Sequence, residues 1–578
     1  MPTLEWIGKE KVINHHQQVP YRVLEGKYTY NAEKSDNMII HGDNLEALKA
    51  LLPVYEGRVK CIYIDPPYNT GNEGWIYNDN VNDPKIRKWL GEVVGREGED
   101  LSRHDKWLCM MYPRLKLLQR LLSVDGIIFI SIDDTEYANL KCICDEIFGS
   151  NCFVSNISWQ RTYSMRNDAK GIPAEVEHIL VYSKRTDWQP QKLERTQAMD
   201  SKYKNPDNDP KGAWRNIVAS APNAITHQGM VYAIQNPITG EFTYPPQGRC
   251  WSLGQDQMLE AMLKWGDYIL IDLCDYEERA RICNVSTEAV RRDVLAIALK
   301  DELSAAKEKA AKIYKTGPLP EFFFSKNGLG ALSRKAYLYQ MGGRPVTNFW
   351  PFEETGHTDE ASRLLKIMFG GTAVFDTPKP PRLIERILHV VGDRKAIVLD
   401  SFAGSGSTAH AVLNMNKADG GNRKFILIEM MDYADSITAE RVRRVIDGYG
   451  EGNKAVEGTG GDFTFYELGQ PLLLPDGNLN EEVDTELIRE YVWYMETKRP
   501  MKPVSSENAY YLGNCRGTGY YFYYEKDRMT TLNHQFLNTI QDRAESYLIY
   551  ADLCTIPDEE LKKYNITFKK IPRDIQKL

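Results

Sequence analysis

The sequence has no long hydrophobic run and few cysteines. No stretch of eighteen or more uncharged apolar residues occurs, and the N-terminal residues lack the apolar core of a signal peptide. We therefore expect neither a membrane span nor a secretory leader, and a cytoplasmic location. The 10 cysteines are scattered, and Cys142 and Cys144, the closest pair, have no second pair or nearby His at metal-ligand spacing. The sequence thus predicts reduced thiols and no metal site.

Positive charge is not in excess either. Lys plus Arg number 72 and Asp plus Glu number 80, so the formal net charge is −8. This balance excludes a uniformly basic surface. On its own it argues against a nucleic-acid partner, because contacts to phosphates need clustered Lys and Arg. Hydrophobic residues make up 42% and charged residues 26% of the 578 residues, which excludes bulk disorder and predicts several globular domains.

Two separated parts of the sequence alternate short apolar runs with helical periodicity. The first part predicts strands at 38–41, 59–64 and 126–132, with helices at 45–52 and 107–122. The second part predicts strands at 396–400 and 424–429, with helices at 383–391 and 407–416. Strand, helix and strand in succession form the unit of a parallel sheet. We therefore predict an α/β fold whose sheet is built from both parts of the chain.

The regions outside these two parts differ in composition. Turn residues and short strands predict an α+β insert between them, and glycines crowd one polar stretch after them. Near the C-terminus we predict an amphipathic helix at 487–495, a hairpin at 513–517 and a last strand at 566–568. The predicted divisions are an arm at 1–37, sheet segments at 38–150 and 376–447, an insert at 151–375, a linker at 448–462 and a small α/β domain at 463–578.

Within the insert, residues 285–314 predict one long helix with many basic side chains. These are Arg291, Arg292, Lys300, Lys307, Lys309 and Lys312, interleaved with Ala and Leu. The pattern fits a solvated helix face and a phosphate-facing helix equally well.

A glycine-rich motif follows the predicted strand at 396–400. It runs from Asp400 through Phe402, Gly404 and Gly406 into a helix, where glycines let a ligand approach the backbone and unpaired N–H groups face it. Glu429 ends the next strand, where a carboxylate can accept both hydroxyls of a ribose. The pattern predicts a nucleoside-containing cofactor. Because it also satisfies the dinucleotide-binding fingerprint, a nicotinamide-dependent oxidoreductase remains an alternative.

A second motif, Asp65-Pro66-Pro67-Tyr68, follows the strand at 59–64. Its two prolines stiffen the backbone and contribute carbonyl groups without N–H donors. The Asp65 carboxylate and the Pro66 carbonyl can accept both hydrogens of an exocyclic amine, and Tyr68 can stack on the base that carries it. Alone, such a tetrapeptide is a common strand terminator. Beside a cofactor loop in the same sheet, it predicts an amine that attacks an electrophilic methyl group.

With both motifs in this order, the chain resembles the amino-methylating, S-adenosylmethionine-dependent DNA methyltransferases of the permuted beta class. More closely, it resembles the modification subunit of type III restriction-modification systems. The matching stretches are Ile64 to Gly71, Lys106 to Leu115, Asp133-Asp134, Asp376 to Pro380, Phe402 to Thr408 and Ile571 to Asp574. The resemblance implies a Rossmann-like methyltransferase sheet, with a catalytic half at 38–150, a cofactor-binding half at 376–447 and a target-recognition insert.

The resemblance also assigns roles to single residues. The catalytic residues at the flipped base would be Asp65, Pro66, Pro67 and Tyr68. The residues around S-adenosylmethionine would be Asp400, Phe402, Gly404 and Gly406 at the methionine part, Glu429 at the ribose, Asp43 at the adenine, and Lys379 and Pro380 at the closing side of the pocket.

An aspartate at the start of the second motif favours adenine N6 over cytosine N4 as the methyl acceptor. No Pro-Cys pair occurs, so methylation of cytosine carbon is not predicted, and no phosphate-binding loop of the ATPase kind is present. The resemblance implies three partners: double-stranded DNA, which would meet the basic residues at 291–312, a second copy in a homodimer, and a separate helicase-nuclease restriction subunit. It also implies a prokaryotic or phage origin. A stand-alone adenine or cytosine-N4 methyltransferase and a catalytically silent DNA-binding adaptor remain alternatives.

Overall fold

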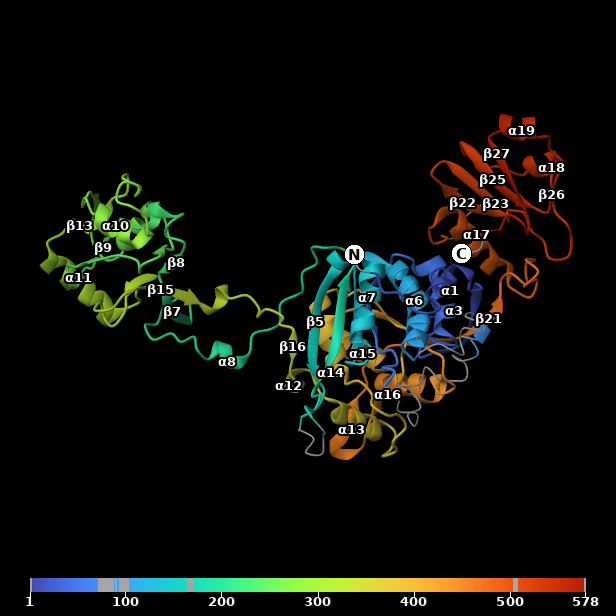
Figure 1. Cartoon of the computed structure of the whole chain (residues 1–578), viewed down its shortest axis with the longest axis horizontal. Coiled ribbons are helices and arrows are strands. Elements are labelled where there is room, and N and C mark those ends of the chain that lie inside the picture. Colours follow the sequence, from blue (N-terminus) through green and yellow to red (C-terminus); the bar gives the residue numbers. More distant parts are fainter. Residues whose placement is uncertain are drawn as a thin grey trace. The chain divides into compact units, whose positions relative to one another are not determined.

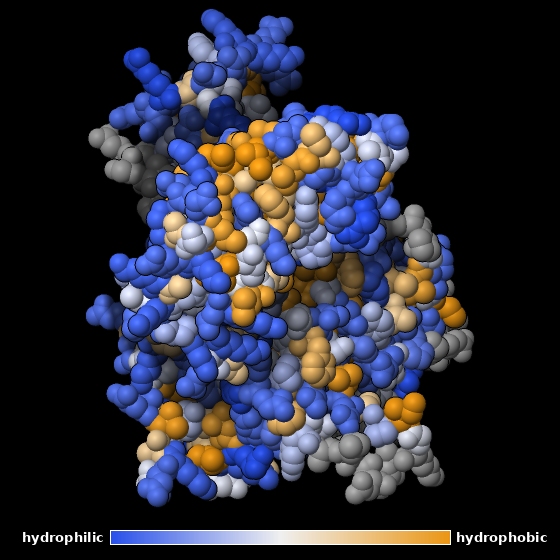
Figure 2. All heavy atoms as spheres, turned by 90° about the vertical axis from the view of Figure 1, so that its left-hand side faces the viewer, coloured by the Kyte–Doolittle hydropathy of each residue, from blue (hydrophilic) through white to orange (hydrophobic). Residues whose placement is uncertain are grey.

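The computed structural model of the chain describes residues 3–70, 88, 91–92, 103–163, 171–502 and 508–575. Gly71 of the predicted motif stretch lies outside these residues. The chain forms two compact units, one from Met1–Gln191 with Val346–Leu578 and one from Lys192–Pro345 (Figure 1). Within the described ranges, no helix combines the length and the apolar character needed to cross a membrane. Hydrophilic side chains cover most of the face shown in Figure 2.

The large unit is built on a ten-stranded sheet with the order β1-β21-β2-β18-β17-β3-β4-β6-β5-β16. Its centre consists of the parallel strands β2 (Met38–His41), β18 (Lys424–Glu429), β17 (Ile397–Asp400), β3 (Val59–Ile64) and β4 (Leu122–Ile132). Most residues of these strands are buried and apolar, as expected for a sheet covered on both faces. β17 and β18 lie between β2 and β3, which confirms the predicted α/β fold with a sheet built from two chain segments.

The helices of the two segments form two groups. α3 (Asn44–Tyr55), α6 (Arg103–Leu121) and α7 (Tyr137–Phe148) make one group, and α14 (Pro381–Val391), α15 (Ser407–Asp419) and α16 (Glu440–Asp447) make the other. Local sequence sets their ends: the Asp43 carboxylate caps α3, Pro381 opens α14, and Gly392, with φ +75, ends it. α12 (Phe352–Thr355) and α13 (Thr358–Met368) precede α14.

The edges of the sheet include segments that the sequence did not predict as strands of it. β1 (Arg22–Tyr30) lies in the predicted arm, after α1 (Lys9–Val12) and α2 (His15–Gln18), and pairs antiparallel with β21 (Phe463–Pro471). Residues 22–30 are therefore not irregular. Most of them are half-buried or exposed, so the strand lacks apolar alternation in the sequence. β5 (Phe153–Gln160), β6 (Val176–Ser183) and β16 (Phe349–Trp350) also join this sheet, although they fall within the predicted 151–375 insert.

The small unit, Lys192–Pro345, has its own hydrophobic core, which contains Trp214, Tyr232, Trp251, Trp265 and Phe324. One of its sheets consists of β7 (Trp214–Val218), β14 (Phe322–Phe324) and β15 (Leu332–Tyr337). A second consists of β9 (Ile234–Gln235), β10 (Phe242–Thr243), β12 (Tyr268–Ile271) and β13 (Ala296–Leu299). Its other strands and α-helices are β8 (Ser220–Pro222), β11 (Arg249–Trp251), α8 (Gln197–Asp200), α9 (Gln255–Met262), α10 (Tyr276–Cys283) and α11 (Leu303–Thr316).

The predicted long basic helix at 285–314 is wrong. α10 ends at Cys283 and is capped by Asn284, which has φ +56, and α11 starts only after β13. The apolar residues of β13 are mostly buried and pair with β12, because a strand covers them better than one turn of an exposed helix would. Arg291 and Arg292 therefore precede the strand and Lys300 follows it, while Lys307, Lys309 and Lys312 lie on α11.

The C-terminal residues form a four-stranded sheet of β22 (Tyr511–Cys515), β23 (Thr518–Phe522), β25 (Ser546–Ala551) and β27 (Ile566–Lys570). α17 (Thr485–Thr497), the hairpin of β22 with β23, and β27 confirm the predicted helix, hairpin and last strand. The other elements here are α18 (His534–Leu537), α19 (Asp558–Lys563), β24 (Thr531–Leu532) and β26 (Leu553–Cys554). The glycine-rich stretch at 448–462 contains a short hairpin of β19 (Gly448–Tyr449) and β20 (Val456–Glu457).

Candidate functional site

The candidate site lies at the carboxyl ends of β17 and β3. The two strands are neighbours, but α15 leads from β17 to β18 on one side, whereas α6 precedes β4 on the other. In α/β sheets a ligand-binding crevice opens at such a switch point. Because Asp400 ends β17 and Asp65 directly follows β3, the sheet brings the two sequence motifs to one place.

The glycine-rich loop after β17 is held by the buried Asp400 carboxylate. Oδ1 accepts a hydrogen bond from the Phe402 N–H (3.0 Å), and Oδ2 accepts one from the Thr408 hydroxyl (2.5 Å). Burial raises the pKa of Asp400 to about 7. Gly406 has φ +81, and a Cβ atom there would lie 3.1 Å from the Thr438 carbonyl oxygen. The loop conformation therefore requires glycine at this position.

Two further predicted cofactor residues flank the loop. Glu429, at the end of β18, accepts hydrogen bonds from the Gly404 N–H and the Met431 N–H, both at 2.9 Å. Asp43 caps the first turn of α3 and lies 3.2 Å from the guanidinium of the buried Arg114. Both carboxylates are thus fixed in orientation, and their assignment to a ribose and an adenine remains a prediction.

A small cavity joins the loop to the second motif. Its lining includes five of the predicted site residues: Asp65, Lys379, Asp400, Phe402 and Gly404. This lining does not include the other predicted site residues, which are Asp43, Pro66, Pro67, Tyr68, Pro380, Gly406 and Glu429. A ligand in the cavity would therefore touch the glycine-rich loop and the Asp65 carboxylate at the same time.

Asp65, Tyr68 and Lys379 meet at one nitrogen atom. Nζ of Lys379 donates to both carboxylate oxygens of Asp65, at 2.8 and 2.7 Å, and to the Tyr68 hydroxyl oxygen at 2.9 Å. The Tyr68 hydroxyl donates to Oδ1 of Asp65 at 2.8 Å. Tyr68 and Lys379 are only 5% and 7% exposed, so these contacts form away from bulk water. The geometry thus contains a set of acceptors that converge on one positively charged nitrogen.

The backbone of the second motif is fixed from one side. The indole N–H of Trp107, on α6, donates to the Pro67 carbonyl at 2.6 Å. None of the described residues donates a hydrogen bond to the Pro66 carbonyl oxygen. This oxygen can therefore accept a hydrogen bond from a ligand.

Two charged residues that the sequence analysis missed complete the cluster around Lys379. Oε2 of Glu177, on β6, lies 3.2 Å from the Tyr68 hydroxyl and 3.5 Å from Nζ of Lys379. Oε1 of Glu177 accepts a hydrogen bond from Arg161 at 2.6 Å. The available signal was the charge of Glu177 within the apolar run of β6, because a buried carboxylate needs a partner.

Burial and the neighbouring charges act against each other in this cluster. Burial raises the pKa of Asp65 above its usual value, although the Lys379 ammonium opposes the change. Burial would also raise the pKa of Glu177, but the cations of Lys379 and Arg161 outweigh it, so the pKa of Glu177 is lowered. For Lys379, burial lowers the pKa and the two carboxylates raise it, with a net increase. The ammonium of Lys379 and the carboxylate of Glu177 are therefore both charged at neutral pH.

Three of the six basic residues predicted to contact DNA already have a partner within the chain. Arg291 pairs with Asp293 at 2.5 Å, Lys309 pairs with Asp301 at 2.7 Å, and the Arg292 guanidinium lies 4.3 Å from the ring centre of Tyr276. Lys300, Lys307 and Lys312 are exposed. The contacts of all six with DNA remain predictions.

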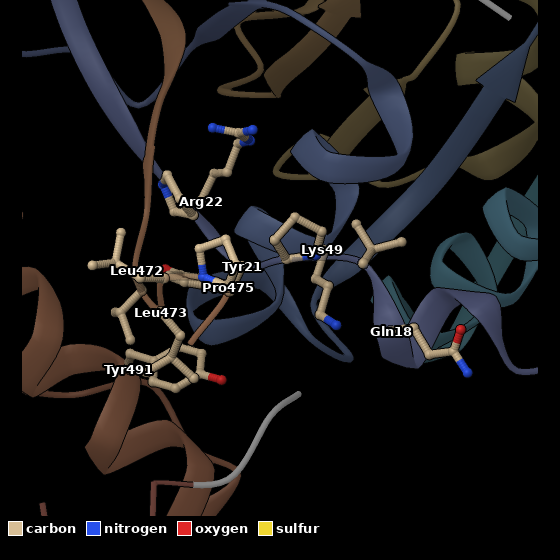
Figure 3. Close-up of a pocket in the computed structure, with 12 residues that line it drawn as sticks. Gln18, Tyr21, Arg22, Lys49, Leu472, Leu473, Pro475 and Tyr491 are labelled. Carbon is tan, nitrogen blue, oxygen red and sulfur yellow. The ribbon is translucent and has the colours of Figure 1, made fainter. Parts of the chain in front are cut away.

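A second pocket in the same unit has no predicted site residue in its lining (Figure 3). Leu472, Leu473 and Tyr491 give it an apolar side (Figure 3). Its two cations are engaged, because Arg22 pairs with Glu46 at 2.8 Å and Lys49 donates to the Gln17 carbonyl at 2.8 Å. It thus offers mainly apolar surface to a ligand.

Comparison with known proteins gives one family and several relatives. Residues 59–242 and 285–440 match the DNA methylase family of N6 and N4 methyltransferases. The Mod subunit of the type III restriction-modification enzyme StyLTI, from Salmonella typhimurium, is 30% identical over 81% of this chain and 66% of that protein. The Mod subunit of the type III enzyme EcoP15I, from Escherichia coli, is 28% identical over 77% and 66%. The type II methyltransferase M.KpnI, from Klebsiella pneumoniae, is 30% identical over 70% and 85%. The chain therefore spans about two thirds of the length of these two type III relatives.

Proposed function

The chain belongs to the DNA methylase family, and we propose that it transfers a methyl group from S-adenosylmethionine to the N6 amine of adenine in duplex DNA. One observation carries the proposal. The Asp65 carboxylate and the Tyr68 hydroxyl converge on a single nitrogen atom, Nζ of Lys379, and Asp65 and Lys379 line the same cavity as the glycine-rich loop. The groups that can accept hydrogen bonds from an amine are thus adjacent to the cofactor loop, as an amino-methyltransferase requires.

The residues at the loop suit S-adenosylmethionine chemically. The N–H groups in the first turn of α15 can bind the carboxylate of its methionine part, the Glu429 carboxylate can accept from its ribose hydroxyls, and Asp43 can accept from its adenine amine. We propose that Phe402 and Pro380 close the apolar sides of this pocket. When bound, the cofactor would supply an electrophilic methyl group to the cavity: the carbon–sulfur bond breaks as the carbon–nitrogen bond forms, S-adenosylhomocysteine leaves, and the methylated nitrogen releases one proton to water.

The residues of the second motif would bind and polarise the target amine. The Asp65 carboxylate accepts one N–H of the amine, and the free carbonyl of Pro66 accepts the other. The face of Tyr68 stacks on the flipped base. Holding both hydrogens keeps the nitrogen lone pair directed at the methyl group, and the Asp65 carboxylate stabilises the positive charge that develops on nitrogen. Catalysis on this proposal consists of positioning and electrostatic stabilisation.

We further propose that the chain is the modification and specificity subunit of a type III restriction-modification system. It would act as a homodimer, with 151–375 as its target-recognition region and a separate helicase-nuclease subunit as its partner. The StyLTI and EcoP15I Mod subunits support this reading by their similarity. A stand-alone methyltransferase is the second candidate, because the match to M.KpnI covers 85% of that type II enzyme. Co-purification with a subunit that cleaves unmodified DNA would support the first candidate over the second.

The test of the activity is incubation of the purified chain with methyl-labelled S-adenosylmethionine and unmodified duplex DNA, followed by nucleoside analysis. N6-methyladenine is the expected product. N4-methylcytosine would favour the alternative acceptor. The absence of any labelled base would favour a silent DNA-binding adaptor. Fluorescence titration with nicotinamide cofactors tests the oxidoreductase alternative.

The matched variant is Asp65→Ala. We expect it to bind S-adenosylmethionine like the wild type and to lose methyl transfer by about a hundredfold or more, the size typical for the loss of one group that stabilises transition-state charge. Wild-type turnover by this variant would contradict the role of Asp65. Expression in a methylation-free host, with base-resolved mapping of modified adenines, would then give the recognition sequence and the strand modified.

A further inference from the structure

The ammonium of Lys379 occupies the Asp65 carboxylate, which the proposed function reserves for the target amine. Its nitrogen lies within 2.9 Å of both Asp65 carboxylate oxygens and of the Tyr68 hydroxyl. It also lies 5.0 Å from the ring centre of Tyr68 and 5.9 Å from that of Trp159, distances at which an aromatic face attracts a cation. A cationic nitrogen is thus already stabilised where the methylated amine nitrogen would become cationic.

We infer that the Lys379 ammonium occupies the position of the target amine until that amine enters the site. Glu177 is then the positioning residue, because its carboxylate binds the Lys379 ammonium once the ammonium has left Asp65. The inference rests on the proposed function. It adds that the Lys379 ammonium must leave the Asp65 carboxylate and that the Glu177 carboxylate binds it.

The ammonium cannot stay on Asp65 during methyl transfer. While it does, it neutralises the carboxylate charge that should stabilise the attacking nitrogen. Two like charges would also stand within a few ångströms of each other as that nitrogen gains its methyl group. In a largely buried site such repulsion is poorly screened. The cation must therefore move away, and it needs a carboxylate to move to, because an unpaired buried ammonium is costly.

Glu177 is the carboxylate within reach. Its Oε2 is 3.5 Å from Nζ of Lys379, already within ion-pair distance, so Glu177 can hold the ammonium as the Lys379 side chain moves off Asp65. Arg161 holds the other oxygen of Glu177 at 2.6 Å, which keeps Oε2 aimed at the cluster. Glu177 is 5% exposed, so solvent screens its attraction for the Lys379 ammonium only weakly. The formal charges of Asp65, Glu177, Lys379 and Arg161 sum to zero, and movement of the ammonium from Asp65 to Glu177 leaves that sum unchanged.

The test is a double-mutant cycle on methyl transfer by the full chain to unmodified duplex DNA. Glu177→Gln keeps the size of the side chain and removes its charge, so Lys379 loses its second carboxylate. We expect kcat to fall at least about tenfold, with unchanged affinity for S-adenosylmethionine. Lys379→Met removes the ammonium, and in that background Glu177→Gln should change kcat less than about twofold.

Two variants serve as controls. Glu177→Asp keeps the charge and should retain more activity than Glu177→Gln. Glu175→Gln, which removes a carboxylate from the same segment outside the cluster, should behave like the wild type. Melting temperatures show whether each variant folds. If Glu177→Gln does not fold, Glu177→Gln combined with Arg161→Gln removes both partners of that ion pair and provides the same cycle against Lys379→Met.

Equal losses from Glu177→Gln in the presence and absence of Lys379 would overturn the inference, because they would show that Glu177 acts without Lys379. Equal rates for Glu177→Asp and Glu177→Gln would overturn it as well. A wild-type chain that methylates no adenine overturns the proposed function itself. The two failures are therefore distinguishable, because the wild-type rate decides one and the ratio of variant rates decides the other.

Discussion

Nζ of Lys379 lies 2.8 and 2.7 Å from the two carboxylate oxygens of Asp65, a residue 314 positions earlier in the chain. The contact depends on strand order, because β17 pairs in parallel with β3 and brings the second chain segment to the end of the first. The Ser407 hydroxyl, at the start of α15, donates to the Lys379 carbonyl at 2.7 Å. The hydrogen bond thus connects Lys379, which contacts the proposed amine-binding residues, to the start of α15, which follows the glycine-rich loop.

Gly406→Ala tests whether the loop conformation supports cofactor binding. The new Cβ would meet the Thr438 carbonyl oxygen at 3.1 Å in a residue with φ +81. We expect a loss of roughly 1–2 kcal/mol of folding free energy from the left-handed conformation, together with weaker binding of S-adenosylmethionine by calorimetric titration. Gly420→Ala is the matched control, since Gly420 has φ +66 and no atom near a new Cβ. Equal cofactor affinity in the two variants would argue against a role for the loop.

Asp400→Asn tests the effect of the buried carboxylate on stability. Its pKa is about 7 in the folded chain against 3.8 as the usual value, because burial disfavours the charge. Between about pH 4 and 7 the folded state therefore binds more protons than the unfolded state, and stability falls as pH rises. We expect the wild type to lose up to about 4 kcal/mol over this interval through Asp400, a loss that Asp400→Asn lacks. Urea unfolding at several pH values measures it.

The control for this pH dependence has the opposite sign. Arg423 lowers the pKa of Asp419, whose carboxylate stabilises the folded state at higher pH and loses this effect as pH falls. Asp419→Asn should therefore flatten the acid side of the stability curve. If wild type and Asp400→Asn have parallel curves from pH 4 to 7, burial of the Asp400 charge does not contribute as argued.

The central sheet could be predicted from the sequence because its strands are buried on both faces. Val59–Ile64 and Lys424–Glu429 are almost continuous apolar runs, and predicted site residues lie at their ends: Asp65 directly follows the first run and Glu429 closes the second. The sequence therefore indicated both the position of these residues at strand ends and the chemistry of their side chains. The roles of these residues toward cofactor and base are still predictions.

The rest of the fold depends on contacts that local sequence does not encode. β1 is a half-exposed edge strand whose partner, β21, lies more than four hundred residues later, so no local period marks it. Glu177 becomes meaningful only when β6 joins the sheet beside β4. In the segment before α11, alternating Ala, Ile and Leu suit a helix or a buried strand equally well, and pairing with β12 decides for the strand.

Lys335→Met tests a buried ion cluster in the small unit. Lys335 is 0% exposed, and its Nζ lies 2.6 Å from Asp207 and 2.5 Å from Asp209. Removal of the cation leaves two carboxylates facing each other, so we expect a loss of about 3–5 kcal/mol in urea unfolding. Lys312→Met on exposed α11 should change stability by less than about 0.5 kcal/mol. The triple variant Lys335→Met, Asp207→Asn and Asp209→Asn should recover part of the loss, and failure to do so would locate the effect in packing.

Neutralisation of the basic residues at 291–312 tests where DNA meets the insert. Lys300, Lys307 and Lys312 are exposed without a described ion-pair partner. Gln substitutions at all three should weaken duplex binding and flatten its dependence on salt. The slope of log affinity against log salt concentration should change by about 0.9 for each phosphate that the variant no longer neutralises. Arg291→Gln and Lys309→Gln should have smaller effects, because Asp293 and Asp301 already neutralise these cations. Fluorescence anisotropy at several salt concentrations gives both quantities. Unchanged affinity and slope in the triple lysine variant would mean that α11 is a solvated face, and the acidic chain would then have to neutralise phosphates with other residues.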